Sequence, residues 1–268
     1  MEQASKEKLN HKLITIEGTD GSGKGTQTTE LFRWLKSEGH EVIIIRFPNY
    51  DSTSAGPVKM YLSGELGSDA NCLDAYQASA LYAVDRLCTM RQILSKLTQD
   101  TIIIFDRYVQ SNMMHQAGKI KNRGELDKFL DWLWDLEFTV LGLPVPDRVL
   151  FLDLPPEISY KIATSRVQLK IGEEFDNDIH ESDESHFFDT YNAAKYVSEK
   201  YSWDVLQCMN EDGTRRTVEE IRDDIRATVS KLISSTKDTS PDALPKESTL
   251  QENKVLTKTK TTKNKISK

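Results

Sequence analysis

The sequence predicts an α/β fold in which a parallel sheet of about five strands carries helices on both faces. Two observations predict it. Near-continuous apolar runs recur along the 268 residues, as in strands that are covered on both faces. Helical patterns lie between these runs, so strand and helix alternate as they do in parallel sheets with crossover helices. A chain of this length suits one sizeable domain.

The expected strands are short and rich in β-branched residues. They are Lys12–Glu17, Glu41–Arg46, Thr101–Phe105, Arg148–Leu152 and, with a weaker pattern, Trp203–Cys208. The first of them ends at Gly18. Each of these runs is bounded by polar or turn-forming residues, which is typical of strands in a parallel sheet.

Two helices stand out between the strands. One is expected from Lys24 to Glu38, followed by Gly39 in the position of a C-terminal cap. The other is expected from Leu73 to Leu97. It has apolar residues at spacings of three, four or seven, and we expect this face to pack in the core. Those residues are Tyr76, Ala80, Val84, Leu87 and Leu94.

Composition narrows the class of protein. The apolar share is 38% and the charged share 29%, and no apolar run approaches the roughly 18 residues of a membrane helix. The polar segment Met1–Lys12 has no apolar centre of a secretory signal, so we expect a cytoplasmic protein without a membrane partner. A net charge of −7 argues against nucleic acid as a partner. Cys72, Cys88 and Cys208 fit neither a disulfide framework nor a metal site.

The chain is expected to contain one domain and two polar ends. Residues 1–11 form an N-terminal extension, and residues 12–235 form the domain. From Thr236 to Lys268 the chain is rich in Lys, Thr, Ser, Asp and Pro and has almost no large apolar residues. Because such a segment cannot bury enough surface to order itself, we expect a disordered tail with no binding role.

A phosphate-binding loop is expected between the first strand and the first helix. Glycines there allow backbone N–H groups to turn inward around phosphate oxygens, the helix N-terminus adds partial positive charge, and Lys24 adds a full one. The alternative is a glycine-rich turn with a solvated lysine. The expected ATP-binding residues are Gly18, Thr19, Asp20, Gly21, Ser22, Gly23, Lys24, Gly25 and Thr26.

This loop departs from the usual phosphate-loop motif at one position. Gly25 stands where a hydroxyl residue is usual, and Thr26 follows one place later. The order Gly-Lys-Gly-Thr resembles the loop of adenylate kinases more than that of GTPases or motor ATPases. We expect Thr26 to supply the hydroxyl group that binds Mg²⁺, and the family resemblance given below implies Asp106 as a second metal-binding residue.

Two arginines are expected at the same edge of the sheet as this loop. Arg46 ends the second strand, and Asp106-Arg107-Tyr108 directly follows the third. Carboxyl ends of parallel strands meet at the edge where open α/β sheets bind ligands. Planar guanidinium groups suit phosphate oxygens, although an arginine after a strand is often only a solvated cap.

Together these motifs resemble the thymidylate kinase family. The resemblance rests on Gly18–Lys24, Arg46-Phe47-Pro48, Tyr82-Ala-Val-Asp-Arg86, Asp106-Arg107-Tyr108, Ser111 and His115-Gln116, and it extends from Leu13 to Ser234. It implies a three-layer P-loop NTP hydrolase-like fold with a lid. It also implies transfer of the γ-phosphate of ATP to dTMP, which yields dTDP and ADP, with Mg²⁺ as cofactor and a homodimer as the assembly.

The resemblance also implies roles for single residues. The aromatic ring at Tyr82 stacks on thymine, Arg86 holds the monophosphate, and Gln116 approaches the base edge. Tyr82 and Arg86 are four residues apart, so they share a helix face. Alternatively, the tyrosine packs in the core and the arginine reaches solvent. The complete expected dTMP site is Phe47, Tyr82, Arg86, Arg107, Ser111 and Gln116.

The expected catalysis is alignment and charge neutralisation. A phosphate monoester with a second pKa of about 6 is already mostly dianionic at neutral pH, so no general base is needed. The expected catalytic residues are Lys24, Asp20, Arg46, Arg107, Asp106 and Arg166, with Asp20 and Asp106 positioning the basic groups and the magnesium ion.

A lid is expected from about residue 165 to residue 186. Family members carry a catalytic arginine in the phosphate loop or in the lid, and this loop has Gly21 where the first group has arginine. The lid would therefore supply the charge, with Arg166 and Lys170 as the available cations. The competing interpretation is a plain exposed acidic loop.

Two other functions remain open from sequence alone. One is a different nucleoside or nucleotide kinase, acting for instance on dUMP, on several pyrimidine monophosphates or on a deoxynucleoside. The other is a P-loop NTPase or a regulatory nucleotide-binding protein that has no small acceptor. Basic residues at the sheet edge favour a phosphate acceptor over a 5′-hydroxyl.

Overall fold

The structure is a computed structural model that describes residues 11–67, 69, 71–97, 100–169 and 184–234, without the side chains of 166–169. By its contacts the chain divides after Ser235, and all described residues belong to the first unit, Met1–Ser235. The expected tail and the centre of the expected lid, including Lys170, lie outside the described residues.

Five parallel strands form one sheet in the order β2-β3-β1-β4-β5. They are β1 Lys12–Glu17, β2 Val42–Arg46, β3 Ile102–Asp106, β4 Arg148–Asp153 and β5 Asp204–Gln207. The predicted α/β fold with a parallel sheet is confirmed. β1 has the predicted bounds, and the other strands shift by no more than one residue at either end. β1 lies between β3 and β4, and all of its residues after Lys12 are buried.

Helices connect the strands on both faces of the sheet. The α-helices are α1 Lys24–Ser37, α2 Gly56–Leu62, α3 Ala75–Leu94, α4 Val109–His115, α5 Arg123–Trp134, α6 Pro156–Leu169, α7 Glu184–Lys200 and α8 Val218–Ser234. Short 3-10 turns are Thr53–Ala55 and Ala117–Lys119. A π-helical segment, Asp135–Val140, continues α5.

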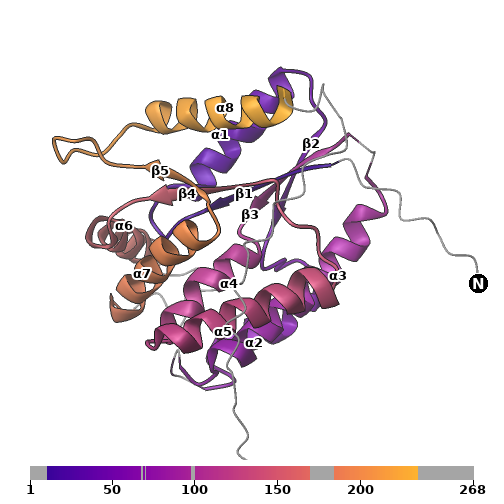
Figure 1. The fold of residues 1–268 in the computed structure, drawn as a ribbon, viewed down its shortest axis with the longest axis vertical. Coiled ribbons are helices and arrows are strands. Elements are labelled where there is room, and N and C mark those ends of the chain that lie inside the picture. Colours follow the sequence, from indigo (N-terminus) through magenta and orange to yellow (C-terminus); the bar gives the residue numbers. More distant parts are fainter. Residues whose placement is uncertain (1–10, 68, 70, 98–99, 170–183, 235–268) are drawn as a thin grey trace, which may run out of the picture. The chain divides into compact units, whose positions relative to one another are not determined.

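The sheet separates two apolar cores. Figure 1 shows α1 and α8 on one face of the sheet and α3, α4 and α5 on the other. On the α1 side, Leu31 and Leu35 pack with Ile221 and Ile225 of α8 against Ile14 of β1. Because strand side chains alternate between faces, neighbouring β1 residues such as Leu13 belong to the other core. The domain is therefore three-layered.

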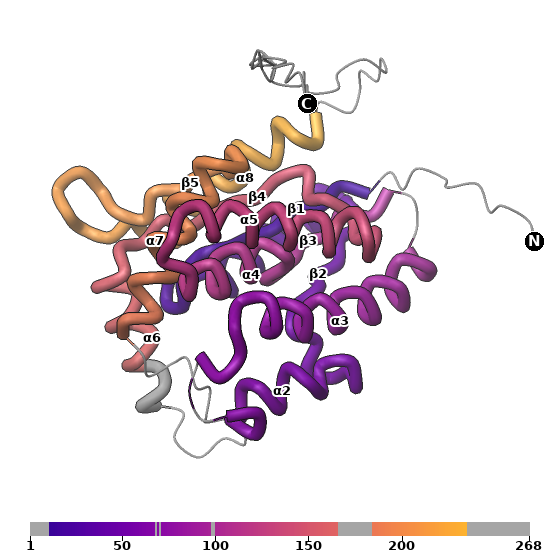
Figure 2. Tube along the Cα trace, turned by 60° about the horizontal axis from the view of Figure 1, so that its bottom comes forward, coloured from indigo at the N-terminus to yellow at the C-terminus, as the bar shows by residue number. Residues whose placement is uncertain are grey.

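The second core is richer in aromatic side chains and lies beneath the pocket described below. Phe105 and Tyr108 stack with ring centroids 4.1 Å apart, and Phe47 lies 5.8 Å from Tyr108. Figure 2 shows α8 on one side of the strands, with α2 and α3 on the other. Among the helices the structure describes, none combines the length and apolar character needed to cross a membrane.

The predicted core face of α3 is wrong for Tyr76, Ala80 and Val84, which are exposed, whereas Leu94 packs against the core as predicted. Tyr76 and Val84 are 37% and 49% exposed, whereas Asp85 and Arg86 are 1% exposed. The buried side chains of α3 are mostly small or polar. Arg86 borders a polar pocket, whereas Ala75 and Met90 belong to the apolar core. Tyr76 instead covers Phe129 from outside, with ring centroids 5.2 Å apart. Apolar spacing therefore did not identify the buried face in the first half of this helix.

We predict that Leu35→Ala lowers the free energy of unfolding by about 2–5 kcal/mol, the usual range for a buried leucine. Leu35 is fully buried between the sheet and α8, and its replacement leaves a cavity. Urea denaturation measures the effect. Lys36→Ala, at the next and exposed position, should stay within about 0.5 kcal/mol of the wild type. Equal effects of the two changes would contradict the packing described for α1.

Candidate active site

The loop between β1 and α1 has the backbone of a phosphate-binding turn. Gly21 and Gly23 have φ values of 85° and 100°, in the left-handed region that favours glycine. A Cβ atom at Gly21 would also lie 2.2 Å from the carbonyl oxygen of Ser159 in α6. The loop is thus packed against α6, and position 21 has no room for a side chain.

Lys24 turns back into this loop. Its Nζ donates to the carbonyl oxygens of Gly18 at 2.7 Å and Thr19 at 3.0 Å, and to Oδ1 of Asp20 at 3.2 Å. Burial lowers the pKa of Lys24, and the charge of Arg107 lowers it further. The ammonium group lies inside the turn, where a phosphate oxygen could replace one of these acceptors.

Arg107 faces the loop from the end of β3. One terminal nitrogen donates to Oδ1 of Asp20, and the other lies 3.2 Å from Nε2 of His115. Burial opposes the charge of Arg107, but Asp20 and Glu17 outweigh it and raise its pKa, so it stays cationic. Burial alone would raise the pKa of Asp20, but Arg107 and Lys24 hold it well below its usual range. The loop and β3 are thus joined by an ion pair.

His115 is neutral in this arrangement. Burial, followed by the charge of Arg107, holds the pKa of His115 well below its usual range. Its Nε2 then accepts the hydrogen bond from Arg107. With Asp20 on one side and His115 on the other, the guanidinium of Arg107 has a fixed direction.

Glu17 is a buried carboxylate at the end of β1. It accepts hydrogen bonds from the backbone N–H of Tyr108 at 3.0 Å and from the hydroxyl of Ser111 at 2.8 and 2.9 Å. Burial raises the pKa of Glu17 to about 7, against the opposing effects of Arg107, Ser111 and Lys24. Glu17 therefore ties the strand before the phosphate loop to the first turn of α4.

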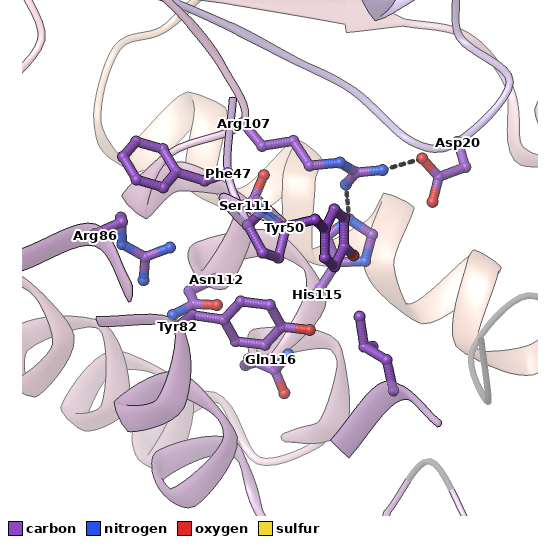
Figure 3. A pocket seen from close by; sticks show the side chains of 12 residues that line it. Asp20, Phe47, Tyr50, Tyr82, Arg86, Arg107, Ser111, Asn112, His115 and Gln116 are labelled. Carbon is purple, nitrogen blue, oxygen red and sulfur yellow. Dashed lines mark hydrogen bonds and ion pairs between the residues drawn. The ribbon is translucent and has the colours of Figure 1, made fainter. Parts of the chain in front are cut away.

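A pocket opens beside the loop and brings the six residues of the expected dTMP site together. Figure 3 shows Asp20 and Arg86 toward opposite ends of it. The lining residues are Asp20, Phe47, Pro48, Tyr50, Leu62, Tyr82, Arg86, Arg107, Ser111, Asn112, His115 and Gln116. Phe47, Tyr82, Arg86, Arg107, Ser111 and Gln116 are all among them.

The surroundings of Arg86 differ from those expected of a residue that holds the monophosphate. Its Nε donates to Oε2 of Glu137 at 2.9 Å and a terminal nitrogen donates to Oε1, so a carboxylate already neutralises its charge. The Arg86 and Glu137 side chains are 2% and 0% exposed. Because Arg107, not Arg86, pairs with the phosphate loop, the geometry does not support Arg86 as the holder of the monophosphate.

The remaining expected catalytic and metal-binding residues are not among the residues that line the pocket. Arg46 is 67% exposed and bonds to Oδ2 of Asp106 at 2.8 Å. Thr26 is exposed in the first turn of α1. Arg166 belongs to α6, but its side chain lies outside the described residues.

Comparison with known proteins identifies the family. The family model described as thymidylate kinase matches residues 16–211. The chain is 32% identical over 166 residues to the thymidylate kinase of Mycobacterium tuberculosis H37Rv, covering 62% of this chain and 76% of the relative. It is 27% identical over 228 residues to the thymidylate kinase of Plasmodium falciparum, covering 84% and 93%. A probable thymidylate kinase of Thermococcus onnurineus is 36% identical over 169 residues, covering 61% and 75%.

This chain belongs to the thymidylate kinase family. The match includes the phosphate loop and every pocket residue, because all of the lining residues fall between positions 16 and 211. The resemblance inferred from the motifs is therefore confirmed at the level of the family. It also means that the pocket described above is the one to compare with a thymidylate kinase substrate site.

Three buried carboxylates of this thymidylate kinase family member had no assigned role in the sequence. Asp85 accepts from the backbone N–H of Asn49 at 2.8 Å and from Ser54 at 2.6 Å, which fixes the loop after Phe47. An acid directly before Gly18, at the end of an apolar strand, could have drawn attention to Glu17. Glu137 gave no such signal, because its partner Arg86 lies 51 residues away.

We predict that Glu17→Gln removes a pH-dependent loss of stability. The pKa of Glu17 rises from 4.5 to about 7 on folding, so its protonated form stabilises the fold fully below pH 4.5, and this contribution is lost as pH rises through about 7. The difference in unfolding free energy between wild type and variant should change by up to about 3 kcal/mol over that window, with the wild type losing stability.

Chemical denaturation at several pH values measures this difference, and subtraction removes the titration of other groups. Glu38→Gln, at an exposed position, controls for the loss of a carboxylate as such. A difference that stays constant across the window would refute the burial effect proposed for Glu17.

Proposed function

We propose that this chain transfers the γ-phosphate of ATP to dTMP, giving dTDP and ADP. The observation that carries the proposal is one pocket that begins at the phosphate loop and contains all six expected acceptor residues. ATP would bind with its phosphates on Gly18–Lys24, where loop glycines and the start of α1 offer backbone donors. The acceptor would fill the pocket with its phosphate toward Arg107.

The proposed catalysis needs no general base. The acceptor phosphate is mostly dianionic at neutral pH, so the obstacle is repulsion between it and the γ-phosphate. Lys24 and Arg107 are cations held at the junction of loop and pocket, and both bond to Oδ1 of Asp20. They can neutralise developing charge without moving far, because their positions are already fixed.

The far end of the pocket suits a pyrimidine base. Asn112 donates through Nδ2 to the carbonyl oxygen of Ser79 at 3.3 Å, which leaves Oδ1 as an acceptor. Arg86 contributes N–H donors beside it. A donor next to an acceptor complements the C4 carbonyl and N3–H of thymine, and not the amino group of cytosine. We therefore assign Arg86 to the base and Arg107 to the phosphate, with Tyr82 as the stacking ring.

Carboxylates near the phosphates fit a Mg²⁺ ion. No cluster of three or more His, Cys, Asp or Glu side chains is placed for a metal among the described residues. Mg²⁺, however, is commonly held by one or two carboxylates together with substrate phosphates. Asp20 and Asp106 each have one carboxylate oxygen without a partner among the described residues. The bound ion would neutralise phosphate charge, and Thr26 is the further oxygen donor proposed nearby.

An additional cation is proposed from α6. Gly21 cannot carry an arginine in this loop, because its Cβ position meets Ser159 and lies 3.2 Å from the backbone nitrogen of Ala163. Positions 159, 163 and 166 share one helix face, so position 166 continues the face that meets the loop. We assign Arg166 to the transferring phosphoryl group, which Arg166→Ala tests by a fall in turnover without weaker dTMP binding.

We also propose a homodimer that uses the outer face of α3. Tyr76 and Val84 of α3 are 37% and 49% exposed, and Met60 of α2, a helix in contact with α3, is 42% exposed. A second copy of the chain would cover this face. Light scattering of the purified chain tests it, and a monomer mass would remove the dimer from the proposal.

The proposed location is the cytoplasm. All three cysteines, Cys72, Cys88 and Cys208, are free thiols. Free thiols are typical of the reducing cytosol, where disulfides rarely persist. Fractionation of cells that express the full chain tests this location.

We predict that ADP release from ATP depends on dTMP and that Lys24→Ala abolishes it while the fold stays intact. Lys24 acts on developing phosphoryl charge rather than on apolar packing. A panel of nucleoside monophosphates should show dTMP as the preferred acceptor and dCMP as a poor one. ADP release that is equally fast without any acceptor would instead favour an NTPase.

We predict that Tyr82→Ala weakens dTMP binding by about 1–3 kcal/mol, the range for truncating an aromatic ring stacked on a base. ATP affinity should stay near the wild-type value, because the donor binds at the phosphate loop. Separate calorimetric titrations of dTMP and ATP measure both. Gln92→Ala, exposed on the same helix, serves as the control. Loss of ATP affinity alone would exclude this pocket as the acceptor site.

A further inference from the structure

The Arg86–Glu137 ion pair forms part of the closed end of the acceptor pocket. Nε and one terminal nitrogen of Arg86 bond to the two oxygens of Glu137, with 2.9 Å between Nε and Oε2. The other terminal nitrogen donates to the carbonyl oxygen of Tyr108 at 3.3 Å. Arg86 lines the pocket, whereas Glu137 lies behind it. The carboxylate therefore holds the arginine from the side away from a bound nucleotide.

Stability alone does not explain this pair. Removing two charges from water is costly, and well-packed apolar residues in their place are often no less stabilising. The Arg86 and Glu137 side chains are 2% and 0% exposed, so both groups are removed from water. We therefore expect this ion pair at the pocket wall to act on the ligand that binds in the pocket.

The backbone around Glu137 is unusual as well. Glu137 belongs to the π-helical segment Asp135–Val140, where the N–H of Leu141 donates to the carbonyl oxygen of Leu136 at 2.9 Å. Short π-helical segments are rare and are frequent at functional sites. Asp135 and Thr139 on either side are exposed, whereas Glu137 points inward. The wider helical turn is the local structure that delivers this carboxylate to Arg86.

One edge of the Arg86 guanidinium is available to a ligand. Of its five N–H groups, two bond to Glu137 and one to Tyr108, which leaves one on each terminal nitrogen without a partner among the described residues. Glu137 offsets the charge of Arg86 alone, whereas Asp20 is shared between Arg107 and Lys24 at the phosphate loop. A nucleotide dianion would thus be drawn to Arg107, and the outer edge of Arg86 would meet an uncharged carbonyl.

We propose that Glu137 is a positioning residue for base selection, which fixes the direction of Arg86 and prevents Arg86 from competing with Arg107 for the acceptor phosphate. This inference rests on the proposed function. Without Glu137, the guanidinium keeps its full charge beside the pocket and loses the fork that holds its plane. The nucleotide would then be bound less firmly at its base, and a base with an amino group in place of the carbonyl would be rejected less strongly.

The test is the kinetics of Glu137→Gln with dTMP and dCMP as acceptors. We expect the KM for dTMP to rise by roughly ten- to a hundredfold, as for loss of a hydrogen bond to a charged group. The preference for dTMP over dCMP should fall by a similar factor, and the KM for ATP should stay unchanged. Glu125→Gln removes a carboxylate from the exposed Glu125–Lys128 pair of α5 and is the matched control.

A second variant decides the question if Glu137→Gln folds poorly. Glu137→Asp keeps the negative charge but shortens the side chain by one methylene group, which moves the carboxylate away from Arg86 while Arg86 itself stays in place. This variant should also raise the KM for dTMP and lower the preference for dTMP over dCMP. A merely structural pair would change the melting temperature and leave this preference intact, and that result would overturn the proposal.

The same measurements separate this inference from the proposed function. If the wild type fails to phosphorylate dTMP, the proposed function falls. If the wild type is selective for dTMP and the folded Glu137→Gln variant retains both its dTMP KM and its selectivity, only the role of Glu137 falls.

Discussion

The parallel pairing of β1 with β3 is the constraint on which the rest of the site depends. The register places Ile16 opposite Asp106, so the phosphate loop and Asp106-Arg107-Tyr108 leave the sheet at the same edge. The backbone N–H of Tyr108 then reaches the carboxylate of Glu17, 91 residues away in sequence. A shift of this register would separate Arg107 from Asp20 and disconnect the loop from α4. The positions of the donor and acceptor sides are therefore set by the sheet.

Carboxylates neutralise the two arginines of the pocket to different degrees. The two ends of the pocket therefore differ in their positive charge. Arg86 is neutralised by a buried carboxylate behind the wall, whereas Arg107 pairs with Asp20, which itself belongs to the phosphate loop. Neutral His115 holds Arg107 without adding charge. Arg107 and Lys24 share the carboxylate of Asp20, whereas Arg86 has the carboxylate of Glu137 to itself. A phosphate dianion is therefore attracted to the loop end of the pocket, and one orientation of a nucleotide is favoured over the reverse. Direction of binding thus follows from the placement of acids as much as from the arginines.

The buried charged groups of this site lower the stability of the fold, and the proposed function explains why they are present. Glu17 is fully buried and its pKa is raised to about 7, which means that its ionised form is disfavoured where it stands. Asp85 and Glu137 are likewise almost fully buried and are fully bonded to polar partners. Apolar residues could fill these places, but they could not hold a loop, a helix turn or a guanidinium in one direction. Precise alignment at phosphate and base is what these acids contribute.

Local signals in the sequence determined the strands and the phosphate loop, and the resemblance of its motifs to a family supplied six of the pocket residues. A short β-branched run predicts a strand and the turn motif needs only neighbouring residues, so Lys12–Glu17 and Gly18–Lys24 could be read directly. The inner face of α3 and the partner of Arg86 could not be read directly from the sequence. Those depend on contacts between residues such as Arg86 and Glu137, which are 51 positions apart. Periodicity reports which side chains are apolar, but only the packed structure decides which helix face borders a polar pocket and which acid neutralises which base.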